Sequence, residues 1–519
     1  MSATVLRALP YHRDTALLLA LMADCPGLVC LDSGLEDRSD ARYDVISSWP
    51  SMQWRSERDS QLAPYLSQRP AGQSQWEPLA NQQQTLLQYL EAWQTSHRPA
   101  SAVLQQLSFL PFCGGLIGYL GYHTTQSIRE GLNPEHYRPT DDPARIALNT
   151  IADAEVGLYE WGIVVDHQRA QCWLFILPEC PAAIRREVIL LEQRILAAAR
   201  QVETANQSGA SASLDASASA DADAGAIVNA SASAEMQSSG LGLEESAFRL
   251  EGSYQALTSS EQYAAAFADI QRWIHAGDCY QVNLAIPFTA RYRGDPLYAY
   301  HDLRQRSKSP FSAFLRLDHG ALLSVSPERF ISVRSRHVTA QPIKGTRPRS
   351  SDPQTDARMR ADLLASEKDK AENLMIVDLL RNDLGKICET GSIQTPRLFD
   401  LQSFSQVHHL VSTVTGTLAP QTSALRLLES AFPGGSITGA PKSRAMQIIG
   451  VLEPVQRSIY CGSIFYHDFN GNLDSNICIR TLLCSDSHIF CWAGSGIVAD
   501  SRWEEEYREC HDKVSALIR

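Results

Sequence analysis

A tract rich in alanine, serine and aspartate, at residues 204–243, interrupts this chain of 519 residues. It contains Ser-Ala-Ser and Ala-Asp-Ala-Asp runs and almost no large apolar side chain. Burial of such a segment cannot offset the conformational entropy lost when the segment is ordered. We therefore expect a low-complexity linker or insertion there, between an N-terminal region of residues 1–203 and a C-terminal region of residues 244–519.

The patterns on either side of the tract indicate the fold class. Residues 183–202 place apolar side chains at helical spacing with charges between them, which predicts an amphipathic helix at the end of the N-terminal region. Residues 260–274 also have a helical pattern, and strand-like and helical segments then alternate irregularly. Because the repeating strand–helix units of a barrel are missing, the pattern favours an α+β fold.

Charge and cysteine usage restrict the partners and the compartment. The chain has 46 Lys and Arg against 58 Asp and Glu and no dense basic run, so a nucleic acid is not an expected partner. Twelve cysteines without a Cys-x-x-Cys pair are expected to be reduced, buried thiols of a cytoplasmic protein. The apolar stretch at residues 16–22 is expected to be a core helix, and no segment is long enough to span a membrane.

Glu328 and Lys344 lie at matched distances from one predicted turn. The runs 330–333 and 338–340 are β-prone, and polar residues separate them, so a hairpin there would place Glu328 opposite Lys344. An acid would then face a potential nucleophile. The same two residues also fit an exposed ion pair, which is the commoner arrangement and contributes little stability.

Two pairs of acidic residues occur at a spacing of three, Asp369 with Glu372 and Glu506 with Glu509. This spacing puts both side chains of a pair on one face of a helix. Two such helices facing one cleft would supply the hard oxygen ligands of a hydrated Mg²⁺. Two ordinary solvated helix faces would show the same spacing, which is common on exposed helices.

The segment 433–442, Pro-Gly-Gly-Ser-Ile-Thr-Gly-Ala-Pro-Lys, runs into a helical pattern at 444–449. The free N–H groups of a helix start, together with Lys442, would bind an anion such as a carboxylate or a phosphate. The segment is not a P-loop, because Ala440 stands where that motif requires lysine, so a nucleotide is not implied. A tight turn that caps a helix explains the segment equally well.

Further downstream, other residues fit an anionic small molecule. Residues 476–481 read as a strand in which Arg480 could clamp a carboxylate. The glycines around Gly494 and Ser495 permit close approach of the backbone to a ligand. His409 is either a polar contact in the same pocket or a structural histidine.

These segments, in this order, resemble the chorismate-utilising enzymes. The similarity covers most of the chain, and only the 204–243 tract looks foreign to the family. The segments that carry it most strongly are 277–284 (Gly-Asp-Cys-Tyr-Gln-Val-Asn-Leu), 326–330 (Ser-Pro-Glu-Arg-Phe), 342–346 (Pro-Ile-Lys-Gly-Thr), 371–379, 381–383, 433–442 and 494–500, with weaker similarity at 31–34 and 112–119. The resemblance implies a two-lobed β-sandwich surrounded by helices, with the site in a cleft between the lobes.

Within that family, the residue at 344 separates activities. Anthranilate synthases typically read Pro-Ile-Ala-Gly-Thr where this chain reads Pro-Ile-Lys-Gly-Thr, the pattern of the large subunits of aminodeoxychorismate synthases. Isochorismate and salicylate synthases usually carry a water-activating lysine at the position of Gln281, which argues against water as the nucleophile. The resemblance therefore implies amination of chorismate by ammonia to 4-amino-4-deoxychorismate, a step of folate biosynthesis.

The resemblance also implies roles for single residues. The Lys344 amine would add to ring C2 in its neutral form, while Glu328, as general acid, protonates the departing C4 hydroxyl. The residues expected to hold Mg²⁺ are Asp369, Glu372, Glu506 and Glu509, where family members often have Glu at the position of Asp369. The expected substrate-pocket residues are Lys442, Arg480, Tyr466, His409, Thr438, Gly494 and Ser495.

Ammonia is expected from solution or from a separate glutaminase subunit, because the sequence has no Gly-x-Cys-x-Gly elbow of a glutamine amidotransferase. Residues 31–33 match the region where relatives bind tryptophan, with Asp32 in place of the glutamate that anthranilate synthases have there. Two other functions stay open. One is anthranilate synthase component I, and the other is a catalytically silent subunit that binds tryptophan or chorismate and regulates a partner.

Overall fold

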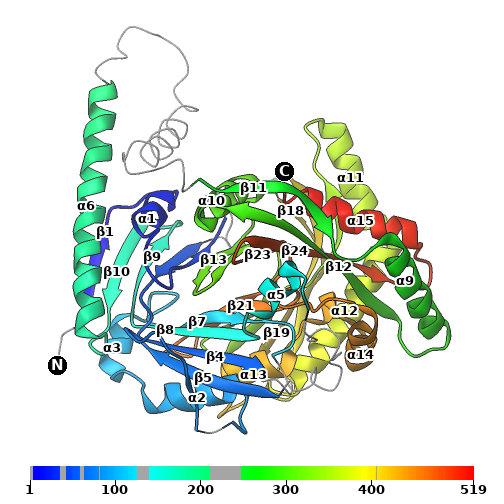
Figure 1. Cartoon of the computed structure of the whole chain (residues 1–519), viewed down its shortest axis with the longest axis horizontal. Coiled ribbons are helices and arrows are strands. Elements are labelled where there is room, and N and C mark those ends of the chain that lie inside the picture. Colours follow the sequence, from blue (N-terminus) through cyan, green and yellow to red (C-terminus); the bar gives the residue numbers. More distant parts are fainter. Residues whose placement is uncertain are drawn as a thin grey trace.

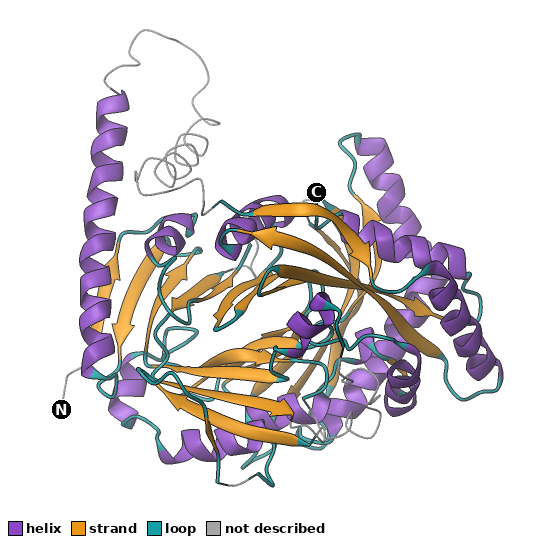
Figure 2. Ribbon diagram, in the orientation of Figure 1, coloured by secondary structure: helices purple, strands orange, loops and turns teal. Residues whose placement is uncertain are grey.

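The computed structural model describes residues 4–34, 42–58, 63–80, 82–124, 140–210, 247–404 and 406–518. Two antiparallel sheets form the centre of the molecule, and helices lie around them (Figures 1 and 2). Side chains from both sheets join one continuous hydrophobic core. The predicted α+β fold, a β-sandwich surrounded by helices, is confirmed.

The first sheet contains strands from the start, the middle and the end of the chain. Its order is β1 (Val5–Leu9), β10 (Gln171–Ile176), β9 (Trp161–Asp166), β3 (Tyr43–Ser47), β2 (Val29–Asp32), β13 (Phe311–Leu317), β14 (Gly320–Ser326), β23 (Thr481–Ser485), β24 (His488–Ile497), β12 (Gln281–Arg293) and β11 (Arg249–Ala256), and β20 (Gly439–Ala440) also pairs with β12.

The second sheet has the same mixed origin. Its order is β17 (Ile343–Pro348), β19 (Val407–Thr417), β16 (His337–Ala340), β15 (Arg329–Arg334), β22 (Leu473–Asn476), β21 (Ser463–Asp468), β7 (Gly115–Leu120), β8 (Ala154–Tyr159), β4 (Met52–Arg58), β5 (Pro64–Pro70) and β6 (Glu77–Pro78), and β18 (Gln394–Ser403) also pairs with β19.

The helices connect these strands and cover the sheets. They are α1 (Ala16–Leu21), α2 (Leu86–Ser96), α3 (Ser101–Gln106), α5 (Pro143–Asn149), α6 (Ala182–Ala210), α9 (Ser260–His275), α10 (Pro296–Ser307), α11 (Pro353–Ala365), α12 (Glu367–Gly385), α13 (Ala424–Ala431), α14 (Lys442–Leu452) and α15 (Trp503–Ser515), with a 3₁₀ turn, η2, at Gly435–Ile437.

Both sheets combine strands from the two sides of the low-complexity tract. In the first sheet β2 pairs with β13, and in the second sheet β7 pairs with β21. Neither region therefore completes a sheet by itself. The linker or insertion predicted at 204–243 falls almost wholly on residues 211–246, which lie outside the described part of the chain, and the region boundaries stay a prediction.

The predicted helices are present, with one difference in length. The helix expected at 260–274 is α9, which begins with a capping box between Ser259 and Gln262. The stretch at 16–22 forms α1, whose Leu18 and Leu19 are buried. The helix expected to end near 202 continues to Ala210 and so includes the first residues of the tract.

The predicted hairpin exists, but its register differs from the expected one. Val333 pairs with Val338, so the turn centres on Ser335 and Arg336, which both adopt positive φ angles of 47° and 67°. A two-residue turn of this kind has its centre between residues 335 and 336. Each strand residue therefore faces a partner one position away from the one expected for a turn centred on 336. Lys344 is not on the returning strand either, since it lies on β17, which pairs with β19.

Two expectations about the environment can be compared with the structure. Within the described ranges, no helix combines the length and the apolar character needed to cross a membrane. All twelve cysteines are free thiols with buried side chains, as the sequence predicts.

Candidate active site

A cavity of about 670 Å³ opens where the two sheets meet α12 and α15. It collects most of the residues that the sequence singled out, although they come from positions nearly 200 residues apart. The predicted residues that line it are Glu328, Lys344, Asp369, Glu372, His409, Arg480, Gly494, Ser495, Glu506 and Glu509. The chemical candidates and the acidic pairs therefore share one cavity.

Glu328 and Lys344 approach each other through a third residue. The Lys344 Nζ donates a hydrogen bond of 3.0 Å to the backbone carbonyl of Ser436, and the Ser436 hydroxyl donates one of 3.1 Å to Glu328 Oε1. Ser436 lies in η2, within the segment 433–442 that was interpreted as an anion site. The sequence did not indicate this role of Ser436, because the segment was interpreted only as an anion-binding loop or a helix cap.

Burial shifts both groups towards their neutral forms. It raises the pKa of Glu328 to about 7, against smaller opposing effects of the Lys344 charge and the Ser436 hydrogen bond. Burial also lowers the pKa of Lys344, and the nearby Lys513 ammonium adds to this effect, while Glu372 and Glu328 oppose it. A protonated carboxyl and a neutral amine at neighbouring positions are the forms that an acid and a nucleophile require.

The four acidic residues lie around the same cavity but have different partners. Asp369 is 3.2 Å from the Arg347 guanidinium, and Glu509 is 2.6 Å from the Lys513 ammonium. The buried Glu506 carboxylate accepts a hydrogen bond from the Ser495 hydroxyl. Glu506 is buried in the cavity wall, whereas Glu509 is exposed and its i,i+4 ion pair is of the kind found on solvated helix faces.

The fourth acidic residue, Glu372, has no hydrogen-bond or ion-pair partner among the described residues. Burial raises its pKa, the charges of Lys344 and Lys368 oppose this shift, and those of Asp369 and Glu506 add to it. Carboxylate oxygens are hard ligands of the kind that Mg²⁺ prefers. The donor set therefore fits this ion, although no His, Cys, Asp or Glu side chains in the described ranges form a group of three or more that could hold a metal as they stand.

Arg480 also lines the cavity. The segment 476–481 is not a continuous strand as predicted, since β22 ends at Asn476, β23 begins at Thr481, and Arg480 adopts a φ of 49°. Its guanidinium has no hydrogen-bond or ion-pair partner among the residues that the structure describes, and burial lowers its pKa. The Arg480 side chain is exposed at the cavity, so its guanidinium is available to a carboxylate ligand.

Two further predicted residues line the same cavity. Gly494 lies on β24, and a Cβ there would be 2.7 Å from the Tyr460 hydroxyl and from the Asn283 side chain, so a larger residue would have to displace them. The His409 Nδ1 is 2.9 Å from the Thr346 hydroxyl, and its ring packs edge-on against Phe404. His409 is thus both hydrogen-bonded and part of the cavity wall.

Three predicted substrate-pocket residues lie elsewhere. Lys442 forms an ion pair with Asp383 and donates a hydrogen bond of 2.8 Å to the Ala431 carbonyl. Thr438 is buried and its hydroxyl donates to the Gly434 carbonyl at 3.1 Å. Neither lines the cavity, because both side chains are used to hold the loop and the start of α14.

Tyr466 is the third of these residues. Its hydroxyl accepts a hydrogen bond from Arg334, and its ring packs against Phe112. It lines a different cavity, because β21 directs it to that side of the sheet. The tyrosine in the wall of the candidate active site is Tyr460, whose ring stacks on Trp492.

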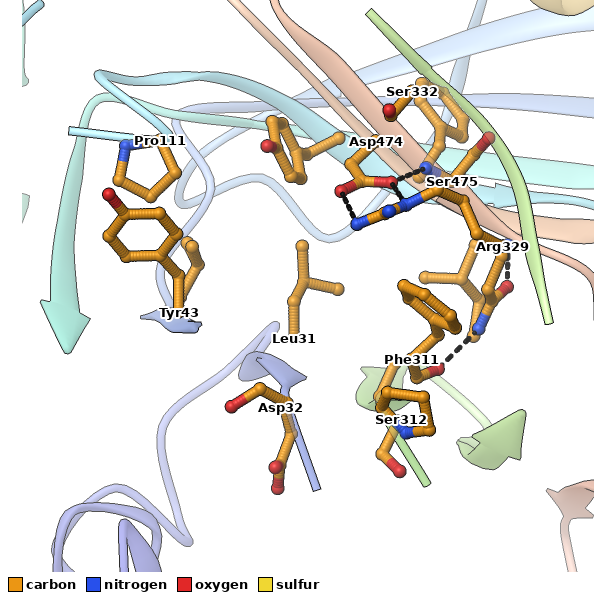
Figure 3. Close-up of a pocket in the computed structure, with 18 of the residues that line it drawn as sticks. Leu31, Asp32, Tyr43, Pro111, Phe311, Ser312, Arg329, Ser332, Asp474 and Ser475 are labelled. Atoms are coloured by element: carbon orange, nitrogen blue, oxygen red, sulfur yellow. Dashed lines mark hydrogen bonds and ion pairs between the residues drawn. The ribbon is translucent and has the colours of Figure 1, made fainter. Parts of the chain in front are cut away.

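The second cavity has a volume of about 430 Å³ and includes the stretch at residues 31–33 (Figure 3). Leu31 and Asp32 lie on one side of it, and Arg329, which forms an ion pair of 3.0 Å with Asp474, lies on the other. The Asp32 carboxylate is buried and paired with Arg304. Arg329 directly follows Glu328 in the chain, so neighbouring residues at the start of β15 line the two different cavities.

An acid, a half-buried amine and a ring of carboxylates in a sandwich of two antiparallel sheets define a class of enzyme that acts on a small anionic molecule. The chain belongs to the family of chorismate binding enzymes, whose model matches residues 49–519. It is 39% identical to aminodeoxychorismate synthase component 1 of Klebsiella aerogenes over 98% of this chain and 97% of the relative. It is 43% identical to the protein of the same name from Escherichia coli over 79% of this chain and 77% of that relative.

Solved structures show the same architecture. Anthranilate synthase component I from Streptococcus pneumoniae superimposes with a TM-score of 0.67 at 27% identity and covers 93% of each chain. The menaquinone-specific isochorismate synthase of Escherichia coli gives a TM-score of 0.64 at 14% identity, covering 99% of this chain and 93% of that one. The second match concerns the fold alone.

Proposed function

We propose that this chain is the large subunit of an aminodeoxychorismate synthase, which converts chorismate and ammonia to 4-amino-4-deoxychorismate and water. The observation that carries the proposal is the half-buried Lys344 amine joined through Ser436 to the buried Glu328 carboxyl. The names of the two relatives with 39% and 43% identity support it.

The first half of the reaction uses the two neutral groups. The Lys344 nitrogen forms a bond to ring C2, the two conjugated ring double bonds shift, and the C4–oxygen bond breaks. The proton of Glu328 goes to the departing oxygen, which leaves as water. A carboxyl with a pKa of about 7 holds that proton at neutral pH, when an ordinary glutamate would have lost it.

The second half restores the enzyme. Ammonia forms a bond to C4, the double bonds shift back, and the bond between C2 and the Lys344 nitrogen breaks. The Lys344 amine leaves the positively charged adduct as a neutral group, and the proton lost by the incoming nitrogen reprotonates Glu328. Dividing the displacement into two steps replaces one difficult reaction by two easier ones.

The cavity supplies groups for both ends of the substrate. Arg480 is the group that we propose to bind a substrate carboxylate, with Gly494 permitting close approach. Glu372, Glu506, Glu509 and Asp369 are the residues that would hold Mg²⁺. When bound, the ion would neutralise a ring carboxylate and withdraw electron density from the ring.

We also propose the partners and the compartment. The ammonia comes from a separate glutaminase subunit, as the designation component 1 of the relatives suggests. The twelve free, buried thiols fit a reducing compartment, the cytoplasm. Tryptophan is the proposed occupant of the second cavity, beside residues 31–33.

Identification of the product tests the proposed function. The protein is incubated with chorismate, ammonium and Mg²⁺, and the product is separated and identified by mass spectrometry. We expect 4-amino-4-deoxychorismate. Anthranilate and pyruvate would instead indicate anthranilate synthase component I, and unconsumed chorismate with every nitrogen donor would indicate a regulatory subunit.

A further inference from the structure

Ser436 touches the acid and the amine with two different atoms. Its carbonyl accepts the Lys344 Nζ hydrogen bond at 3.0 Å, and its hydroxyl donates to Glu328 Oε1 at 3.1 Å. The residue is half-buried in the cavity wall, between a loop residue at 328 and a strand residue at 344. A change in Ser436 therefore acts on both groups at once.

The backbone of Ser436 is fixed by contacts on both sides. A Cβ on Gly435 would be 2.1 Å from the side chain of Leu379 on α12, so the turn lies directly against that helix. The Ile437 carbonyl accepts a hydrogen bond of 3.1 Å from the buried Arg457 guanidinium, and the Thr438 hydroxyl holds Gly434. The Ser436 carbonyl and hydroxyl are therefore presented to the cavity from a rigid turn.

We propose that Ser436 is a positioning residue that places the proton of Glu328 on the oxygen that faces the substrate and holds the Lys344 amine ready to attack. Because the hydroxyl donates to Oε1, the carboxyl proton is carried by Oε2, where it can go to the departing oxygen. The carbonyl engages one N–H of the amine and leaves the nitrogen lone pair free. This inference rests on the proposed function.

The charged groups around the pair come from three elements. Lys344 is the charged group that faces Glu328, and Lys344 itself faces Glu372 of α12 and Glu509 and Lys513 of α15. None of these charges changes when the Ser436 hydroxyl is removed. A hydroxyl that donates to the carboxylate stabilises its ionised form, so removal of the hydroxyl raises the pKa of Glu328 further.

The test is the pH dependence of adduct formation at Lys344, measured by quenched-flow mass spectrometry with chorismate and Mg²⁺ in the absence of a nitrogen donor. Without ammonia, the titration of ammonium does not enter the profile. For Ser436→Ala, we expect the maximal rate of adduct formation to fall roughly tenfold. We also expect the high-pH limb of the profile, where the rate falls as Glu328 loses its proton, to move up by about one pH unit. The hydrogen bond of Lys344 is retained in this variant, because the Ser436 backbone carbonyl makes it.

Two variants complete the design. Ser436→Thr keeps a hydroxyl and is expected to restore the position of the high-pH limb. Ser443→Ala removes a hydroxyl from an exposed position on α14 and should match the original protein throughout. A Ser436→Ala profile with unmoved limbs, or a Thr variant that behaves like Ala, would overturn the inference. If the unchanged protein itself forms neither adduct nor product, the proposed function fails instead.

Discussion

Single substitutions of Glu328 and Lys344 can test the effects of placing an acid and an amine in one cavity. Glu328 and Lys344 are each held in an environment that disfavours their charged forms. Such pairs are expected where function, not stability, selects the residues. Two predictions follow at this scale, one for turnover and one for stability.

Replacing the amine removes the nucleophile. For Lys344→Ala, we expect the rate of 4-amino-4-deoxychorismate formation at neutral pH to fall strongly, because the remaining groups cannot form the covalent intermediate. Initial rates at fixed chorismate and Mg²⁺ over a range of ammonium concentrations measure the loss. Higher ammonium is expected to restore part of the rate if ammonia attacks the ring directly, whereas unaltered kinetics would exclude a covalent role.

Replacing the acid changes the stability in a pH-dependent way. The pKa of Glu328 is raised from 4.5 to about 7 in the folded state. Ionisation of this carboxyl therefore lowers the free energy of unfolding as the pH rises from 4.5 to about 7. Glu328→Gln should therefore raise the free energy of unfolding by up to about 3 kcal/mol at pH 8 and by little at pH 4.5. Urea unfolding of both proteins at the two pH values tests this, and an equal difference at both would contradict it.

The family resemblance assigned roles to Glu328 and Lys344, whereas their spacing alone also fitted an exposed ion pair and the hairpin on which it rested does not carry Lys344. The sequence did not reveal Ser436, whose backbone carbonyl makes half of the contact and leaves no trace in the residue type. The family resemblance suggested Tyr466 as a pocket residue, but Tyr466 lines the second cavity and Tyr460 lines the candidate active site, a difference that only the path of the chain decides.

At the scale of elements, α12 and α15 bring the carboxylates to one wall of the cavity. Glu506 and Glu509 flank the apolar stripe of α15, in which Cys510 and Val514 are buried, as the helical pattern of the sequence indicates. The start of α12 is fixed by Ser366, whose hydroxyl accepts a hydrogen bond from the Asp369 N–H. These local signals explain why the acidic pairs could be placed on helices from the sequence.

Replacing Glu372 tests the proposal that the acidic residues of the cavity hold Mg²⁺. For Glu372→Gln, we expect a loss of Mg²⁺ affinity of at least about tenfold, since a hard carboxylate ligand is removed from a site with few alternatives. Calorimetric titration with Mg²⁺ and the Mg²⁺ dependence of turnover measure it independently. Glu367→Gln is the matched control on the same helix, because that exposed side chain pairs with Lys370 and is not part of the cavity wall.

Other element-level details could not be predicted from local patterns. The hairpin register is set by positive φ angles at Ser335 and Arg336, which neither residue type suggests. The expected strand at 476–481 breaks because Arg480 also adopts a positive φ and turns its side chain to the cavity wall. Departures of this kind are found where a functional side chain has to be presented.

At the scale of the whole molecule, the two sides of the tract form one core. The pairing of β2 with β13 and of β7 with β21 joins residues separated by hundreds of positions. Local periodicity contains no information on such pairings, so the sequence supported the α+β class and the sandwich but not the strand order. The family resemblance, rather than the pattern, predicted the two-lobed arrangement.

Shared sheets predict how the molecule responds to cleavage. A protease site inserted after Ala220 should permit cutting between the two regions, and the halves should stay associated and retain most of the activity, because both sheets hold them together. Size-exclusion chromatography and turnover after cleavage measure this. Residues 247–519 expressed alone are expected not to fold, and an active, monomeric fragment would contradict a shared core.

The most direct measurement is intact-protein mass spectrometry after brief exposure to chorismate and Mg²⁺ without any nitrogen donor. We predict an added mass equal to chorismate less one water, located on Lys344 by peptide mapping, lost on addition of ammonium and absent from Lys344→Ala. Formation of 4-amino-4-deoxychorismate with ammonium, but with no such adduct under any condition without it, would contradict the covalent role of this lysine.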